Sequence, residues 1–256
     1  VESVDRLSGR TLTTELNYRH GHWDGAEREF RGFGLVEQRD TESFESYDAV
    51  GPHDGGSVAA DRERFSPPTV TRTWFHLGPV GPEHGDWREL DYGDEYWEGD
   101  PRALSRPEDP RELLAGLDRR DRRDAVRSLA GTRLRTEVYA RDGTDRSDRP
   151  YRVSEHRYGL REEGRPVTGR RDDPRSYFPH PRGSRSTTWE RGRDPMSRYS
   201  FVGAYDPYGQ SRLELSVVCP RGWEPGDATA GYDASYTETN YVHRDEPDRY
   251  VVDRVD

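Results

Sequence analysis

Two histidines have a spacing that could support metal binding. His20 and His22 are separated by one residue, and in a β-strand this spacing places both imidazoles on the same face. Two histidines with no third ligand near them in the sequence make an incomplete site, so a structural or solvent-exposed role is the favoured interpretation. The sequence therefore predicts no metal ligand and no bound metal.

Two acidic pairs, Glu27/Glu29 and Asp94/Glu95, could provide the general acid and base of a glycosidase. The chain contains 50 acidic residues, so such pairs arise by chance and a solvated surface is the favoured interpretation. Arg-specific ADP-ribosyltransferases combine an Arg, a Ser-Thr-Ser strand and a later Glu-x-Glu. The segment 186–188 resembles the strand, but the Glu-x-Glu at 27–29 precedes it, which is the wrong order.

The sequence lacks a P-loop, a Gly-rich dinucleotide fingerprint, a nucleophile-elbow serine, a zinc-protease helix and paired-cysteine metal motifs. We therefore predict no catalytic residue, no cofactor-binding residue and no cofactor. An enzyme, either glycosidase or ADP-ribosyltransferase, remains the third hypothesis for function.

Composition restricts the partners and the fold. The 256 residues carry 40 basic side chains, all of them Arg, against 50 acidic ones, for a net charge of -10. Nucleic-acid binders usually have a basic surplus, so we predict no nucleic-acid partner. Only 30% of residues are hydrophobic, and no stretch approaches the roughly 20 apolar residues that a membrane span needs. The same scarcity argues against a doubly wound α/β enzyme, whose strands are apolar runs.

The elements that would position these residues are mostly strands. Asp24-Gly25 and 206–209 are typical of tight turns, and polar stretches at 40–68 and 161–185 predict two long loops, with little regular structure over 78–110. Alternating or Thr-rich segments predict strands at 12–18, 33–38, 70–77, 134–140, 151–158, 187–190, 198–202, 213–219, 236–242 and 250–255. The predicted fold is mainly β, with extended antiparallel sheets and hairpins.

One short helical insert is predicted near 110–130. Asp109 can act as N-cap, Pro110 occupies the first helical position, and Glu112 stands three residues after the cap. Gly116 and the charged middle weaken the helix, which predicts a break into two, and Gly131 can end it. A narrow apolar stripe predicts a position on the surface and not in a core; it consists of Leu113, Leu117, Val126 and Leu129.

The segment 18–34 is the densest in aromatic, charged and glycine residues. One interpretation is a ligand groove, for instance for sugar. The favoured one is a tight hairpin with paired charges and packed rings. In that hairpin Arg28 and Arg31 pair with Asp24, Glu27 or Glu29, while Trp23, Phe30 and Phe33 pack together.

Several segments resemble a known family. The segment "YRHGHWDGAEREFRGFGLVEQRDTE" at 18–42 is similar to the middle region of the B component of bacterial insecticidal Tc (ABC) toxin complexes, a SpvB-related family. The likeness continues in the same order through "TRTWFHLG" at 71–78, "GTRLRTEVYARDGT" at 131–144, "RPYRVSEHRYG" at 149–159 and "YDPYGQ" at 205–210. The last of these also resembles Rhs/YD-repeat proteins.

The resemblance implies a non-catalytic, structural role in a secreted toxin. In that family the B and C components build a hollow, Rhs-like β-sheet shell around the toxic C-terminal part of C, and a propeller of B docks to the A-component channel. It implies as partners the C component, the A channel, and the chain's own flanking shell and propeller regions. It also implies synthesis in the bacterial cytoplasm followed by secretion.

The chain as a whole is expected to be one segment of a larger polypeptide. Residues 1–256 would form a single middle-region unit, with Rhs/YD-like strands towards 131–256. Cys219 is alone, the sequence starts without Met or an apparent signal peptide, and it ends on a strand-like stretch. The alternative hypothesis for function is a β-rich module of a surface protein that binds carbohydrate or another protein.

Overall fold

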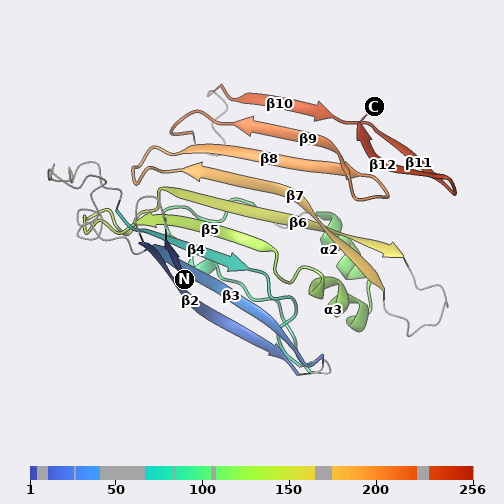
Figure 1. Cartoon of the computed structure of the whole chain (residues 1–256), viewed down its shortest axis with the longest axis horizontal. Coiled ribbons are helices and arrows are strands. Elements are labelled where there is room, and N and C mark those ends of the chain that lie inside the picture. Colours follow the sequence, from blue (N-terminus) through green and yellow to red (C-terminus); the bar gives the residue numbers. More distant parts are fainter. Residues whose placement is uncertain are drawn as a thin grey trace.

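The main feature of the fold is one antiparallel sheet of ten strands, β1 to β10, each paired with its neighbours in sequence (Figure 1). This computed structural model describes residues 1–4, 11–25, 27–40, 67–82, 85–104, 108–164, 175–223 and 231–255. The ten strands are β1 (Glu2–Val4), β2 (Thr11–Asp24), β3 (Glu29–Asp40), β4 (Thr69–Phe75), β5 (Arg133–Ala140), β6 (Arg152–Gly164), β7 (Ser176–Thr188), β8 (Met196–Tyr205), β9 (Ser211–Val218) and β10 (Asp233–Glu238). The prediction of a mainly antiparallel β fold is confirmed.

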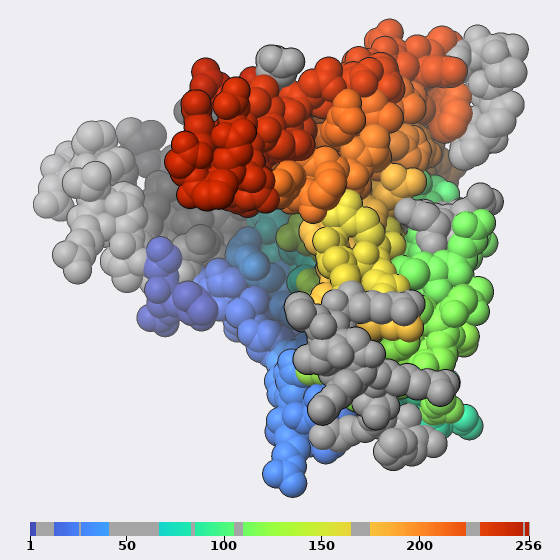
Figure 2. All heavy atoms as spheres, turned by 90° about the vertical axis from the view of Figure 1, so that its right-hand side faces the viewer, coloured from blue at the N-terminus to red at the C-terminus, as the bar shows by residue number. Residues whose placement is uncertain are grey.

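A separate hairpin follows the sheet. It consists of β11 (Tyr241–Glu246) and β12 (Arg249–Val255), and it pairs with no strand of the main sheet. The single strand expected at 236–242 is therefore two strands, β10 and β11, with a break at 239–240. Figure 2 shows this hairpin in red at one end of the molecule and the blue β2–β3 hairpin projecting at the other.

Turn chemistry explains much of the sequential order. The chain turns at Gly25 between β2 and β3, as Asp24-Gly25 predicts. A second turn joins β8 to β9, where the Gly209 N–H donates to the Asp206 carbonyl over 3.1 Å. The predicted loop at 40–68 falls almost entirely outside the described residues.

The predicted loop at 161–185 is wrong where the structure describes it. β6 continues to Gly164 and β7 begins at Ser176, so the chain forms a long hairpin there. Pro179 and Pro181 suggested a loop because proline cannot donate a backbone hydrogen bond. Both lie in the part of β7 before Gly183, which pairs with β6 but not with β8, so prolines there meet the one-sided pairing of an edge strand.

Two short α-helices interrupt the strands in the part of the chain that the structure describes. The predicted break is confirmed: α2 is Glu108–Gly116 and α3 is Arg119–Arg127. Asp118 caps α3, and its carboxylate accepts from the Asp121 N–H over 2.9 Å. The predicted N-cap, Asp109, is wrong, because the helix already includes Glu108.

The prediction of a surface position for this insert is also wrong. The helices and the residues that directly follow them contribute most of a hydrophobic cluster against β6, made of Leu114, Leu117, Ala125, Val126, Leu129 and Leu160. Each helix has a narrow apolar stripe. The break between the helices lets both stripes face β6, and together they cover that part of the strand. No helix among the described residues is long and apolar enough to cross a membrane.

Charged side chains occupy much of the remaining interior. Along β5 Arg135, Glu137 and Tyr139 are buried on one face, whereas on the other face Thr136 and Val138 are only partly buried and Ala140, the last residue of the strand, is buried. The segment between β4 and α2 crosses over this charged face. Within its described residues this segment contains one 3-10 helix, η2 (Gly93–Glu95), and little other regular structure, as expected.

Candidate functional site

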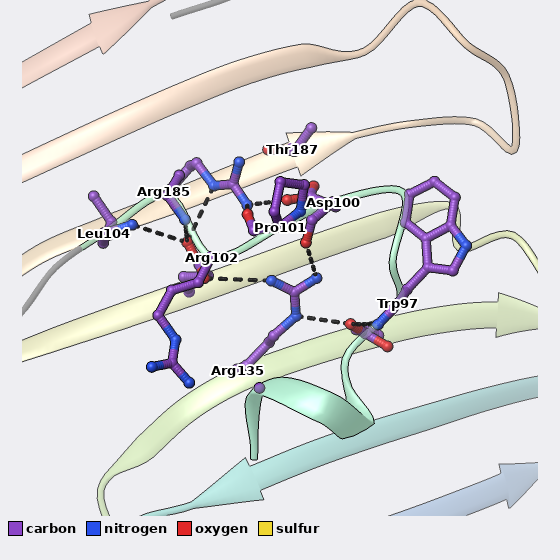
Figure 3. Close-up of polar contacts among 12 residues, drawn as sticks. Trp97, Asp100, Pro101, Arg102, Leu104, Arg135, Arg185 and Thr187 are labelled. Atoms are coloured by element: carbon purple, nitrogen blue, oxygen red, sulfur yellow. Dashed lines mark hydrogen bonds and ion pairs between the residues drawn. The ribbon is translucent and has the colours of Figure 1, made fainter. Parts of the chain in front are cut away.

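The largest buried polar group lies where the segment 97–104 crosses β5, β6 and β7. We call it the buried charge cluster; its members are Asp100, Arg135, Glu137, Glu155 and Arg185 (Figure 3). Each of these side chains is between 0% and 7% exposed. An unpaired buried charge is very costly. The contacts within this cluster therefore determine whether the segment 97–104 can pack against the sheet.

Arg135 is the centre of the cluster. Its Nε donates to Glu137 Oε1 over 2.7 Å, and its two terminal nitrogens reach Glu155 Oε1 at 3.3 Å and the Asp100 carbonyl at 2.8 Å. The guanidinium also lies 4.6 Å from the ring centroid of Tyr96. A planar fork can bind three acceptors in fixed directions, which a lysine ammonium cannot do in the same way.

The two glutamates hold the backbone of the covering segment. Glu137 accepts from the Trp97 N–H over 3.0 Å, and Glu155 accepts from the Ala103 and Leu104 N–H groups over 3.1 and 3.3 Å. The Tyr139 hydroxyl also donates to Glu137 over 2.5 Å. Burial raises the pKa of Tyr139, and the neighbouring Glu137 charge raises it further, so this hydroxyl remains a donor.

Asp100 anchors the other side of the same segment to β7. Its carboxylate accepts from Arg185 and, over 2.6 Å, from the Trp189 indole N–H. Trp97 packs edge-on against Trp189, with ring centroids 5.0 Å apart. Arg185 Nε lies 3.3 Å from Glu155, which closes the cluster. Each charge thus lies beside an opposite charge inside the group, which holds three carboxylates and two guanidinium groups, and the arrangement clamps a loop to a sheet.

A second group, the Asp24 clamp, joins the β2–β3 hairpin to α3. Asp24 is 3% exposed and accepts from Arg31 and Arg123, each over 2.6 Å. Burial alone would raise the pKa of Asp24, but the Glu27 N–H and the two guanidinium groups outweigh it and lower the pKa to about 2. Residues 99 positions apart in the chain are therefore joined by one carboxylate.

The two family models that match this chain decide its family. The model described as the insecticide toxin TcdB middle/C-terminal region matches residues 124–250, and the middle/N-terminal region model matches residues 2–52. Together the two ranges span well over half of the chain. The chain belongs to the TcdB middle-region family.

Solved structures agree with this assignment. The crystal structures titled TcdB2-TccC3-Cdc42 and TcdB2-TccC3 without the hypervariable C-terminal region are each 25% identical, with TM-scores of 0.73 and 0.71. A Photorhabdus luminescens Tc holotoxin pore is 24% identical, with a TM-score of 0.68. Each covers 100% of this chain, which spans 12% of the matched chain. No curated protein sequence matches.

The candidate acids and hydroxyls do not come together in this TcdB middle region. Glu27 and Glu29 pair with Arg127 at 3.2 and 2.6 Å, beside the Asp24 clamp. Ser186 and Thr187 lie in β7, and three strands separate β7 from β3, a span of about 19 Å. The Glu-x-Glu and the Ser-Thr-Thr segment therefore cannot share a substrate in this fold.

His20 and His22 do not share one strand face as expected. His20 has a φ of 57°, and the β2–β3 register shifts between Gly21 and Trp23, so the simple alternation of faces fails. His20 Nε2 lies 2.7 Å from Glu95, the second acid of the other candidate pair. Burial lowers the pKa of His22, and the nearby Arg31 and Arg123 lower it further. Among the described residues no group of three or more potential ligands is positioned to hold a metal ion.

The dense hairpin at 18–34 is only partly as expected. Arg31 pairs with Asp24, as predicted. Arg28 has no ion pair within the described part of the chain, and its φ of 53° turns it into the exposed tip. Phe33 packs on Phe30, with ring centroids 5.1 Å apart, and Trp23 lies directly opposite Phe30 in the β2–β3 register with 60% of its side chain exposed.

Sequence reasoning missed the buried charge cluster. The signal was present in "RLRTEVYA", where Arg135, Glu137 and Tyr139 alternate with Leu134, Thr136 and Val138. Nothing local says which of the two faces is covered. The partners Asp100 and Arg185 come from a segment and a strand far along the chain, so only the fold brings them together.

Proposed function

We propose that this chain is a wall segment of the β-sheet shell that a toxin-complex B component builds with its C component. In this role it would enclose the toxic C-terminal part of the C component. The observation that carries the proposal is the sheet itself. Ten antiparallel strands follow one another in chain order, with β1 and β10 as the two open edges, and the whole sheet aligns with TcdB2.

Residues 1–256 would act as one unit within a longer B component. The partners would be the C component, the A-component channel reached through a propeller of B, and the chain's own flanking shell and propeller regions. The protein would be made in the bacterial cytoplasm and work outside the cell as part of the complex. These roles extend to this chain what the solved TcdB2-TccC3 and holotoxin pore structures represent.

The role is proposed to be non-catalytic. The most buried acids and arginines are engaged with one another and with backbone N–H groups. Such clusters suit a wall because they fix a covering layer to a sheet that has few apolar residues, and Arg provides more directed bonds per charge than Lys.

Two positions on opposite faces of β8 test the enclosure. Arg198 is exposed and Phe201 is 39% exposed, and their separation by three residues in a strand places them on opposite faces. In a Cys219→Ser background, Arg198→Cys and Phe201→Cys are labelled with a bulky maleimide, first in the isolated 256-residue chain and then in full-length B component assembled with C.

A wall separates an inside from an outside. We therefore expect both cysteines to react in the isolated chain and only one of them to react in the assembled complex. Equal labelling of both positions in the complex would show that neither face is enclosed and would refute the wall role. Cys219 is 2% exposed, and its replacement by serine removes the one thiol of these 256 residues, while the same complex without either introduced cysteine gives the background labelling of the rest of the assembly.

A further inference from the structure

A cavity of about 440 Å³ lies between the buried charge cluster and the ends of β7 and β8. Small ligands and peptide side chains usually occupy cavities of about 300–1,000 Å³. Three aromatic residues line it, Trp189, Tyr199 and Trp223, and two prolines, Pro101 and Pro195, complete the apolar surface. Nothing in the wall role uses this cavity.

The aromatic lining is held in place by contacts on its outer side. Trp189 packs edge-on against Trp97 at 5.0 Å and donates its indole N–H to Asp100 over 2.6 Å. Tyr199 and Trp223 meet edge-on, with ring centroids 6.4 Å apart. Fixed rings lose little conformational entropy when a ligand binds, so this lining is suited to recognition.

Most of the polar atoms around the cavity are already engaged with each other, although the buried Arg185 Nε makes no hydrogen bond and only lies 3.3 Å from Glu155. The Thr187 and Ser197 hydroxyls lie 3.0 Å apart, and Arg185 pairs with Asp100. Burial raises the pKa of Tyr199, and the hydrogen bond between its hydroxyl and Arg185 works in the opposite direction. A sugar needs several unengaged donors and acceptors, and these side chains offer few.

Arg193 is the exception. It lines the cavity, its side chain is exposed, and it has no ion pair within the described residues. A free guanidinium at the edge of an apolar cavity favours a ligand with an acidic group next to an apolar one.

We propose that this cavity binds an extended, proline-rich peptide segment that carries an acidic residue beside its prolines. Grooves lined by Trp and Tyr recognise polyproline II segments because these are already extended and lose little entropy on binding. The prolines would pack on Trp189, Tyr199 and Trp223, and the carboxylate would pair with Arg193. The inference does not depend on the shell, since it concerns the folded chain alone.

The test measures fluorescence anisotropy of a labelled peptide titrated with the full-length B component that contains this chain. The peptide repeats Pro-Pro-Glu-Pro, and two controls replace Glu by Lys or Pro by Gly. We expect saturable binding of the acidic proline peptide and affinities at least about tenfold weaker for both controls. A labelled soluble chitin oligosaccharide is titrated in parallel.

Matched variants locate the site. Trp223→Ala removes one wall and is compared with Trp23→Ala, a substitution of an exposed Trp on the β2–β3 hairpin. Arg193→Glu is compared with Arg198→Glu on the open face of β8. We expect the first of each pair to weaken binding about tenfold or more and the second to leave it unchanged. Arg193 is exposed, so its variant tests the site even if Trp223→Ala fails to fold.

Three results would overturn the proposal. The first is an absence of saturable binding by the acidic proline peptide. The second is binding that survives both Trp223→Ala and Arg193→Glu. The third is binding of the chitin oligosaccharide alone, which would assign the cavity to carbohydrate. A preference of Arg193→Glu for the Lys peptide would support the predicted charge pairing directly.

Discussion

The two halves of the sheet are built differently. Around β5 and β6 one face is covered by the segment 76–132, and side chains such as Val153, Glu155 and Leu160 are buried. In β10 every residue is exposed, and in β9 the apolar Leu215 is 37% exposed. The same antiparallel pairing therefore supports a two-layered region and a region that is a single layer of strands (Figure 1).

The difference between the two regions shows which contacts hold the segment 76–132 over the sheet. In the two-layered region, buried Arg–carboxylate groups bind the covering segment through its backbone N–H groups. In the C-terminal region the row Phe201, Leu215 and Tyr236 lies at directly paired positions and remains partly exposed. Cross-strand pairs alone stabilise a sheet weakly, so the first region should carry most of the folding free energy.

The strongest test of this comparison removes the centre of the buried charge cluster. Arg135→Ala leaves Glu137 and Glu155 buried with no cationic partner from β5. Breaking a buried ion pair in this way usually costs about 3–5 kcal/mol, so we expect a loss of that size in the free energy of unfolding. Urea denaturation followed by near-UV circular dichroism measures it.

The matched control is Arg198→Ala, on the exposed face of β8. An exposed substitution of this kind should change stability by no more than about 0.5 kcal/mol. If Arg135→Ala cost no more than Arg198→Ala, the charge cluster would not be what holds the covering layer.

A second test compares apolar side chains in the two regions. Leu129 is 5% exposed within the helical cluster, and Leu215 is 37% exposed on β9. Leu129→Ala should cost about 2–5 kcal/mol, because it leaves a cavity, and Leu215→Ala should cost well under half as much. Thermal denaturation of both variants provides the comparison, and equal losses would contradict the division into a covered and an uncovered region.

Local chemistry explains what the sequence could predict. The Asp24-Gly25 turn, the 206–209 turn and the alternation in 134–140 depend on neighbouring residues, and each is present in the structure. The break between α2 and α3 was also readable, because Gly116 and the charges around it weaken a helix locally.

Long-range contacts explain the features that could not be predicted from the sequence. On β5 the alternation of Leu134, Thr136 and Val138 with Arg135, Glu137 and Tyr139 does not say which face is covered, and in the structure it is the charged face that is buried. The reason is Asp100, 35 residues away, and Glu155 on the next strand, which pair with Arg135. Prolines likewise suggested a loop at 161–185, but the open edge of β7 accommodates them.

A third test uses acid to weaken the Asp24 clamp. The folded-state pKa of Asp24 is about 2, below its usual value of 3.8. A depressed carboxyl pKa contributes stability that is fully present above the unfolded-state pKa and is lost as pH falls from about 4 towards 2; the shift corresponds to about 2 kcal/mol. Asp24→Asn should therefore lower stability at neutral pH and flatten the pH dependence between pH 5 and 2.

Urea denaturation at a series of pH values measures this effect. The control is Asp145→Asn, an exposed acid in the turn between β5 and β6. It should reduce neither the stability at pH 7 nor the slope below pH 5. A pH dependence as steep in Asp24→Asn as in the parent chain would show that the α3–hairpin contact does not depend on the carboxylate.

The smallest expected effect is in the C-terminal region, where Asp206 organises the turn before β9. Its Oδ1 accepts from the Tyr208 and Gln210 N–H groups, each over 2.9 Å, and its Oδ2 lies 2.9 Å from His243 of β11. Asp206→Ala removes these contacts at a cost of about 1 kcal/mol. Because the β11–β12 hairpin lies outside the main sheet, that loss should appear as local opening.

Amide hydrogen exchange separates a local from a global effect. We expect amides of Tyr241–Glu246 to exchange about fivefold faster in Asp206→Ala, while those of β5 and β6 stay unchanged. Asp245→Ala is the matched control, because Asp245 receives one 3.4 Å bond from the Tyr208 hydroxyl and should matter less. Faster exchange in β5 as well would show that the two regions unfold together, and the division between them would then be one of burial and not of stability.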